Sequence, residues 1–290
     1  MNATETPGRT PFGAKLRAAM DQHGPLCVGI DPHPGLLDHW GLPHSAAGLE
    51  TFVMTCIEAF GGVVAAVKPQ SAFFEQHGSA GIAVLEKALS ALRKAGTLTV
   101  LDAKRGDIGS TMAAYAAAYL ADEAPLRADA ITLSPYLGYG SLRPAIDTAV
   151  GTGRGVFVLA LTSNPEGASV QHAGGAGGSV AGTIVHGVRE DNRRAARHRQ
   201  LGSVGMVVGA TVGEAVQHLG LDLAGANAPL LAPGIGAQGG TADDLRRVFG
   251  AALPNVLATS SREILAAGPD IGALREQALR TAEGLRGVLR

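Results

Sequence analysis

The residues from Asp102 to Asp107 place two carboxylates around one lysine, in the order Asp-Ala-Lys-Arg-Gly-Asp. On a strand, residues two apart point the same way, so Asp102 and Lys104 would share one face and Ala103 would lie on the other. Asp107 follows Gly106, where the strand is expected to have ended. Carboxylates beside an ammonium favour its charged form, which makes Lys104 a poor Schiff-base nucleophile but a suitable proton donor to a carbanion. Spacing alone leaves a structural ion pair as the alternative.

Charged and hydroxyl side chains also stand at the ends of other apolar segments. They are Asp31, Lys68, the pair Thr162 and Ser163, and Arg262. A sheet does not need charges there for its stability, whereas the catalytic groups of α/β barrels lie where the strands end. We therefore interpret these side chains, together with Asp102 and Lys104, as parts of one functional site.

Eight short apolar segments, each bounded by turn-forming residues, are the predicted strands. They are nearly continuous in hydrophobicity, which is typical of parallel strands covered on both faces. Helix-like stretches separate them, and successive segments begin about 33 residues apart, the length of one βαβ unit. The predicted strands are Leu26–Asp31, Val63–Pro69, Leu98–Lys104, Ala128–Leu133, Gly155–Leu161, Val204–Thr211, Pro229–Gly236 and Asn255–Arg262. The helical stretches include Pro11–His23, Ser45–Phe60, Ser79–Ala95, Thr111–Ala121, Val180–Arg199 and Thr241–Phe249.

This repeat predicts an α/β protein with a (β/α)8 TIM barrel and an extra N-terminal helix in front of the first strand. The barrel would form a single domain over residues 12–290, preceded by a flexible N-terminus at residues 1–11. A final amphipathic helix after Arg262 would close it. An open doubly wound sheet has the same local pattern and is the structural alternative.

The composition narrows the function classes. The chain has 290 residues, of which 46% are hydrophobic and 17% charged, enough apolar residues for a sizeable core. Its formal net charge of -1 provides no basic field to hold nucleic acid or an anionic membrane. Cys27 and Cys56 lie in apolar segments and are expected to be reduced core thiols. Without a signal segment or a long apolar run, we expect a cytoplasmic globular protein.

Two further features concern ligands. The nine histidines show neither H-x-x-x-H nor H-E-x-x-H spacing, so no zinc site is predicted. The connection Ser163–Ser179 is unusually long and contains the glycine-rich run Gly174–Gly178. Long loops of this kind are functional lids or disordered segments, and the sequence leaves both readings open.

The motif Asp102-x-Lys104-x-x-Asp107-Ile108-Gly109-x-Thr111 resembles the active-site signature of the orotidine 5'-phosphate decarboxylase family. The internal Ala-Lys-Arg-Gly-Asp resembles the longer bacterial branch of that family. Further blocks agree in order, and the similarity runs from about Phe12 to Leu265. These blocks are Gly29–Pro32, Val67–Glu75, Thr162–Pro165, Ala232–Gly236 and Ser260–Arg262.

The resemblance implies decarboxylation of orotidine 5'-monophosphate to uridine 5'-monophosphate in de novo pyrimidine biosynthesis, with neither a metal nor an organic cofactor. Lys104 would stabilise and protonate the ring carbanion, and Asp102 and Asp107 would hold Lys104. The family pattern also implies a homodimer, in which Asp107 and Thr111 reach the active site of the neighbouring subunit.

The same resemblance assigns substrate contacts. Asp31 and Lys68 match the residues that bind the ribose, and Ser163 matches the serine that binds the pyrimidine ring. Gln238 and Arg262 match the residues of the phosphate-binding corner, where Gly234 and Gly236 let backbone N–H groups approach the phosphate. Such a corner recurs in TIM barrels. A guanidinium suits phosphate because it can donate two parallel hydrogen bonds.

One departure concerns the loop Ile235–Thr241, which is short and has no tyrosine, although some family members carry a long phosphate-gripping lid there. The identity of the lid is therefore open, and the glycine-rich run Gly174–Gly178 is a candidate for that role.

Two other functions compete with the decarboxylase. A magnesium-dependent phosphosugar aldolase or decarboxylase of the same superfamily would need additional acidic ligands, for which Glu58 and Glu75 are poorly placed in the sequence. A non-catalytic barrel that binds phosphosugars would be marked by loss of Lys104 or its flanking acids, and all of them are present.

Overall fold

Eight parallel strands form a closed barrel in the computed structural model, which describes residues 8–235 and 240–289. Each strand pairs with the next along the chain, and the last pairs with the first. The strands are β1 (Leu26–Ile30), β2 (Ala66–Pro69), β3 (Leu98–Arg105), β4 (Ala130–Leu133), β5 (Gly155–Leu161), β6 (Val204–Val208), β7 (Leu230–Ala232) and β8 (Val256–Ser260). The predicted TIM barrel is confirmed, and the open doubly wound sheet is excluded.

Several strands are shorter than the apolar segments that predicted them. The seventh segment was expected to reach Gly236, but β7 ends at Ala232 because Pro233 has no N–H for the ladder. The sixth was expected to reach Thr211, but β6 ends at Val208, beside the last residue of β5, Leu161, and a turn follows at Ala210 and Thr211. The eighth ends two residues before Arg262.

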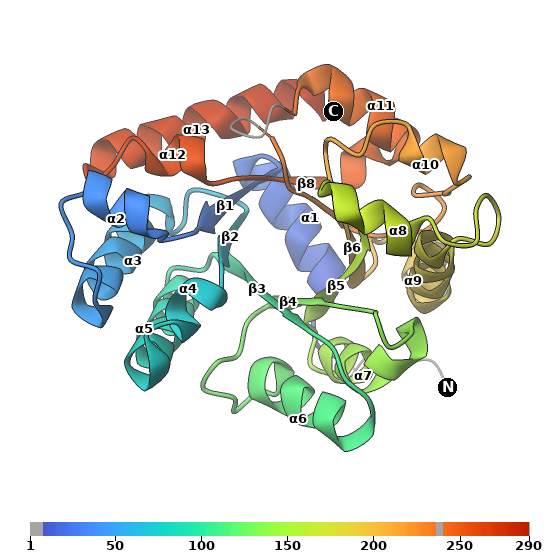
Figure 1. The fold of residues 1–290 in the computed structure, drawn as a ribbon, viewed down its shortest axis with the longest axis horizontal. Coiled ribbons are helices and arrows are strands. Elements are labelled where there is room, and N and C mark those ends of the chain that lie inside the picture. The colour runs from blue at the N-terminus through green and yellow to red at the C-terminus, as the bar shows by residue number, and fades with distance from the viewer. Residues whose placement is uncertain (1–7, 236–239, 290) are drawn as a thin grey trace.

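All helices but the first surround the barrel in chain order, as Figure 1 shows. Polar N-caps start several of them: the side chains of Ser45, Ser179, Thr241 and Asp270 each accept a backbone N–H from the first turn. The helices are α1 (Phe12–His23), α2 (Pro34–His39), α3 (Ala46–Phe60), α4 (Ala72–Glu75), α5 (Gly78–Lys94), α6 (Gly109–Leu120), α7 (Arg143–Gly151), α8 (Ala168–Gln171), α9 (Val180–Arg197), α10 (Ala215–His218), α11 (Ala242–Phe249), α12 (Arg262–Leu265) and α13 (Ile271–Val288), with 3-10 turns at Tyr139–Leu142, Pro165–Gly167 and Gly250–Asn255.

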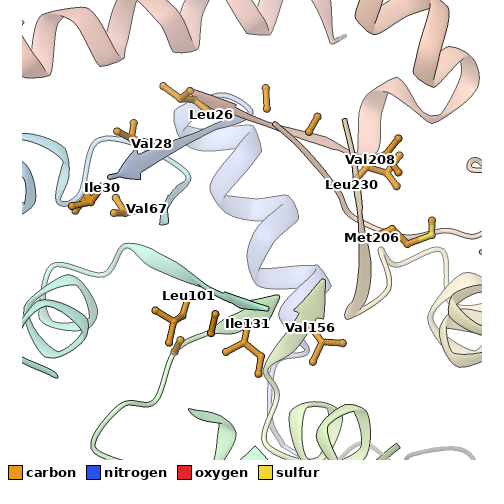
Figure 2. Packing of buried hydrophobic residues seen from close by; sticks show 14 of the residues in the cluster. Leu26, Val28, Ile30, Val67, Leu101, Ile131, Val156, Met206, Val208 and Leu230 are labelled. Atoms are coloured by element: carbon orange, nitrogen blue, oxygen red, sulfur yellow. The ribbon is translucent and has the colours of Figure 1, made fainter. Parts of the chain in front are cut away.

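The strands bury both of their faces, in two separate hydrophobic cores. Outward-facing residues such as Val28, Leu101 and Val156 pack under the surrounding helices, and Figure 2 shows these side chains radiating away from the barrel centre. Inward-facing residues such as Val100 and Leu257 fill the barrel together with the N-terminal helix. Burial on both faces explains why the strands appear in the sequence as nearly continuous apolar runs.

Helix α1 fills one end of the barrel. Phe12 is fully buried, and its ring meets that of Phe157 edge to face at a centroid distance of 6.0 Å. Just before the helix, Arg9 donates hydrogen bonds to Asp122 at 2.9 and 2.7 Å, so the described part of the predicted flexible N-terminus contacts the barrel. Residues 1–7 of that segment lie outside the described residues. Phe12 lies against Gly155, the first residue of β5, so α1 covers the amino ends of the strands and leaves their carboxyl ends open.

None of the helices in the described part of the chain combines the length and the hydrophobicity that a membrane span requires.

Candidate active site

A cavity of about 240 Å³ opens at the carboxyl ends of the strands. It brings together most of the strand-end residues singled out in the sequence, although they come from segments far apart in the chain. Its lining comprises Gly29, Asp31, Lys68, Gln70, Asp102, Lys104, Thr132, Leu159, Thr162, Val207, Leu231, Pro233, Gly234, Ile235, Thr259, Ser260, Ser261 and Arg262. The cavity therefore has a charged side from β1 to β3 and an apolar floor from β5 to β7.

Four alternating charges form the charged side. The Lys68 ammonium lies 3.6 Å from Oδ1 of Asp31 and 3.2 Å from Oδ2 of Asp102, and the Lys104 ammonium lies 2.7 Å from Oδ1 of Asp102. Neighbouring strands place them, because β2 pairs with both β1 and β3. The predicted sharing of one face by Asp102 and Lys104 is confirmed by this contact.

Burial and neighbouring charges fix the ionisation of the central pair. Burial would lower the pKa of Lys68 and raise that of Asp102, since a low-dielectric site disfavours charge. The two carboxylates outweigh burial at Lys68 and raise its pKa. The ammonium groups of Lys68 and Lys104, with hydrogen bonds from Lys104 and Thr132, lower the pKa of Asp102 from 3.8 to about 2. Both groups are therefore charged at neutral pH.

Thr132 is a site residue that the sequence reasoning missed. It lies on β4 and is 1% exposed. Its hydroxyl donates to Oδ1 of Asp102 at 2.8 Å and accepts the backbone N–H of Lys104 at 2.9 Å. A polar residue inside the otherwise apolar run Ala-Ile-Thr-Leu was the only available signal.

Asp107 and Thr111 stand apart from this array. Asp107 accepts the backbone N–H of Ile108 at 2.8 Å, and among the described residues it forms no ion pair. Thr111 is exposed on α6. Among the described residues, Asp102 alone of the two flanking carboxylates contacts Lys104, and the predicted position of Asp107 beside a lysine stays a prediction.

Thr162, rather than Ser163, lines the cavity after β5. Gln171 of α8 holds this turn: its amide oxygen accepts the N–H of Thr162 at 2.9 Å, and its amide nitrogen donates to the Thr162 hydroxyl at 2.7 Å. Ser163 is exposed beside Gly209 at the same end of the barrel. Its predicted contact with the pyrimidine stays a prediction.

The opposite rim carries the predicted phosphate corner. Arg262 is exposed at the start of α12, lines the cavity, and has no ion-pair partner among the described residues. Gly234 lines the same rim with φ at 106°, a conformation that side chains rarely permit. Gly236 and Gln238, which were also predicted here, lie outside the described residues.

The acidic residues considered for a magnesium ion do not line the cavity. Glu58 is exposed on α3, and Glu75 accepts hydrogen bonds from Ser71 and Arg105. Over residues 8–235 and 240–289, no group of three His, Cys, Asp or Glu side chains is arranged to hold a metal.

The glycine-rich run Gly174–Gly178 connects α8 to α9 and is held by backbone hydrogen bonds, including those from Gly175 to His172 and from Gly178 to Gly175. Figure 1 shows this connection projecting outward on the right side, beyond α8. None of its residues lines the cavity as described. Its role as a lid stays a prediction.

Comparisons with known proteins identify the family of the chain. The model of the orotidine 5'-phosphate decarboxylase / HUMPS family matches residues 24–277. The orotidine 5'-phosphate decarboxylase of Salinispora arenicola is 59% identical over 278 residues, covering 96% of this chain and 98% of the relative. The enzyme of that name from Streptomyces coelicolor is 59% identical over 277 residues, covering 95% and 97%.

Solved structures show the same relation. A crystal structure assigned as orotidine 5'-phosphate decarboxylase from Streptomyces avermitilis superposes with a TM-score of 0.91 at 56% identity, covering 99% of both chains. The Leishmania donovani OMP decarboxylase has a TM-score of 0.73 at 30% identity, covering 97% of this chain and 99% of the other. The chain therefore belongs to the orotidine 5'-phosphate decarboxylase / HUMPS family.

Proposed function

We propose that this protein decarboxylates orotidine 5'-monophosphate to uridine 5'-monophosphate, a step of de novo pyrimidine biosynthesis. The observation that carries the proposal is the Lys104 ammonium, held 2.7 Å from Asp102 in a cavity whose other rim presents Arg262, which has no ion-pair partner among the described residues. A proton donor and a phosphate anchor thus face one space. The relatives at 59% identity bear this activity in their names and favour it over the magnesium-dependent phosphosugar enzyme.

The proposed reaction requires stabilisation of a negative charge and transfer of one proton. The bond from the pyrimidine ring to its carboxylate breaks, CO2 leaves, and the electron pair stays on the ring carbon. The Lys104 ammonium stabilises that carbanion electrostatically and then donates its proton to the same carbon. Neutral Lys104 recovers a proton from water, while Asp102 keeps the ammonium in position. No cofactor enters this balance.

Asp31 and Lys68 are proposed to bind the ribose. Asp31 Oδ1 is buried and accepts no hydrogen bond from the part of the chain that the structure describes; the Lys68 ammonium lies 3.6 Å from it. Buried carboxylate oxygens without a donor are rare because leaving them unpaired costs free energy. A ribose hydroxyl would supply the missing donor.

Arg262 is proposed to bind the phosphate, with backbone N–H groups near Gly234 and with Gly236 and Gln238 from the neighbouring loop. A guanidinium can donate two parallel hydrogen bonds to phosphate oxygens. Ser163 is proposed to hydrogen-bond the pyrimidine ring, at the end of the substrate away from the phosphate.

A homodimer completes the proposal, with Asp107 and Thr111 contributed to the neighbouring site. Apolar side chains exposed beside β3 and β4 support it: Ile108 is 61% exposed, Tyr136 79% and Leu137 52%. Exposed apolar residues gathered on one region are typical of protein interfaces. Sedimentation of the wild type as a dimer and of Tyr136→Asp as a monomer would support this arrangement, and a monomeric wild type would contradict it.

We propose a cytoplasmic location, which suits the free buried thiols of Cys27 and Cys56. Neither nucleic acid nor a membrane is proposed as a partner, because the net charge of -1 offers no basic surface field for them.

The test is loss of the orotate absorbance when purified protein is mixed with orotidine 5'-monophosphate and excess EDTA. We expect fast loss with the wild type, none with Lys104→Ala, and wild-type rates with Lys87→Ala, whose side chain is 61% exposed on α5. Activity abolished by EDTA would instead favour the magnesium enzyme. No loss with the wild type would refute the proposed activity and direct the search to phosphosugars.

A further inference from the structure

Lys104 has an unusual main-chain conformation for a residue inside a strand. Its φ is 46°, in the left-handed region that residues with a side chain seldom adopt. The pairing of β3 with β4 shifts register between Leu101 and Arg105, so Lys104 sits in an irregular part of the ladder. A conformation of this kind persists only when surrounding contacts enforce it.

The hydroxyl of Thr132 supplies such a contact. It accepts the backbone N–H of Lys104 at 2.9 Å, which the irregular ladder would otherwise leave without a strand partner. The same oxygen lies 2.8 Å from Oδ1 of Asp102, and that carboxylate oxygen also accepts from the Lys104 ammonium at 2.7 Å. A closed ring of contacts thus connects the main chain of Lys104 to its own side chain.

The chemistry of the groups determines the direction of each hydrogen bond. A backbone N–H can only donate, so the Thr132 oxygen must accept from Lys104. The hydroxyl hydrogen is then available to Asp102, whose ionised carboxylate can only accept. Because Thr132 is β-branched and buried, its χ1 angle is restricted and the oxygen stays between the two partners.

We propose that Thr132 is a positioning residue for the decarboxylation, because its hydroxyl holds both the main chain of Lys104 and the carboxylate of Asp102. The inference rests on the proposed role of Lys104 as proton donor. Substrate is held mainly by the ribose and phosphate contacts, none of which involves Thr132. Loss of the hydroxyl should therefore affect the chemical step more than substrate binding.

The kinetic test uses Thr132→Val, which keeps the shape of the side chain and removes the hydroxyl. A displacement of about 1 Å at a reacting group can reduce the rate about 100-fold. We expect kcat to fall about 100-fold, KM to change less than about threefold, and Thr132→Ser to restore kcat to within about fivefold of the wild type.

Thr99 offers a matched control on β3. It is 2% exposed, and its hydroxyl likewise joins a carboxylate and a main-chain amide: it lies 3.1 Å from Oδ2 of Asp129 and accepts the N–H of Asp129 at 2.9 Å. Thr99 does not line the cavity. Thr99→Val should lower thermal stability about as much as Thr132→Val and leave kcat within about twofold of the wild type. Equal kcat values for the two valine variants would overturn the proposal.

A crystal structure of Thr132→Val tests the positioning independently of any activity. We expect Lys104 to leave the left-handed region and its ammonium to move out of hydrogen-bond distance from Asp102. An unchanged Lys104 would refute the inference even if the enzyme acts on orotidine 5'-monophosphate. If Lys104 is displaced in the Thr132→Val crystal structure but the wild type is inactive on that substrate, the proposed function is refuted and the positioning of Lys104 by Thr132 stands.

Discussion

The ion pair between Lys68 and Asp102 should contribute several times more stability than an exposed pair of shorter length. Its atoms are 3.2 Å apart, and the side chains are 9% and 11% exposed. Lys87 and Glu50 form the comparison pair, at 2.8 Å with exposures of 61% and 41%. Because the exposed pair is the closer one, the two pairs separate the effect of burial from that of distance.

Two quantities set the expected coupling energy between Lys68 and Asp102. At 3.2 Å and an effective dielectric constant of about 20, the attraction is about 5 kcal/mol. The lowering of the Asp102 pKa from 3.8 to about 2 combines the cost of burial with the stabilisation by Lys68, Lys104 and Thr132, and it corresponds to about 2 kcal/mol. We therefore expect a coupling energy of about 3 kcal/mol for the buried pair, and less than about 1 kcal/mol for Lys87 with Glu50.

A double-mutant cycle measures this coupling through the free energy of unfolding in urea at pH 7. The buried cycle uses Lys68→Met, Asp102→Asn and their combination. Each single variant leaves one charge partly uncompensated and should lose about 3 kcal/mol or more, whereas the double variant should lose less than the sum. The exposed cycle uses Lys87→Met and Glu50→Gln. Additive losses in the buried cycle, or equal coupling in both, would refute the reasoning.

Four further outcomes are expected. As pH falls from 4 to 2, the wild type should lose about 2 kcal/mol of unfolding free energy that Asp102→Asn does not lose. A carboxyl with a depressed pKa stabilises the fold above its unfolded pKa of 3.8 and ceases to do so below its folded pKa of about 2. Urea titrations at each pH measure this difference. Phe12→Ala should lower the unfolding free energy by about 3–5 kcal/mol without changing kcat, since it empties the end of the barrel opposite the cavity. Arg262→Ala should raise KM about 100-fold, equivalent to about 3 kcal/mol of lost hydrogen bonding to phosphate, and added guanidinium ion should recover part of the loss. Deletion of Gly174–Gly178 tests the lid: a raised KM for the substrate would support it, and unchanged saturation kinetics would eliminate it.

The barrel could be predicted from the sequence because parallel strands covered on both faces are apolar throughout and recur at the length of a βαβ unit. The ends of the strands could not be predicted as well, because an apolar run can continue after its hydrogen-bonded ladder has stopped. Beyond Val208 the chain remains apolar through Ala210, and Gly209 still donates its N–H to the carbonyl of Leu161, but Leu161 is the last residue of β5 and β6 ends beside it. A ladder depends on the neighbouring strand, which hydrophobicity along one segment does not describe.

The charged residues of the site could be found in the sequence because they interrupt the apolar pattern of the strands. Asp31, Lys68 and Arg262 stand out because each ends an apolar run, and the barrel then brings these ends together. Thr162 and Ser163 are adjacent and chemically alike, so the sequence could not tell which one turns toward the cavity. The bonds from Gln171, nine residues later, hold Thr162 there.

The motif of Asp102 and Lys104 on β3 does not explain the whole site, because Thr132 on β4 contacts both residues. The spacing of Asp102 and Lys104 predicts that both face the cavity, but an ideal strand would give Lys104 a negative φ. Its observed conformation accompanies a register shift against β4, and the residue that meets the displaced N–H is on β4. The position of the Lys104 main chain is therefore a property of two neighbouring strands. If Thr132 has the proposed positioning role, transfer of Asp102 and Lys104 to another barrel reproduces the charges but not their geometry unless a hydroxyl is placed at the position of Thr132.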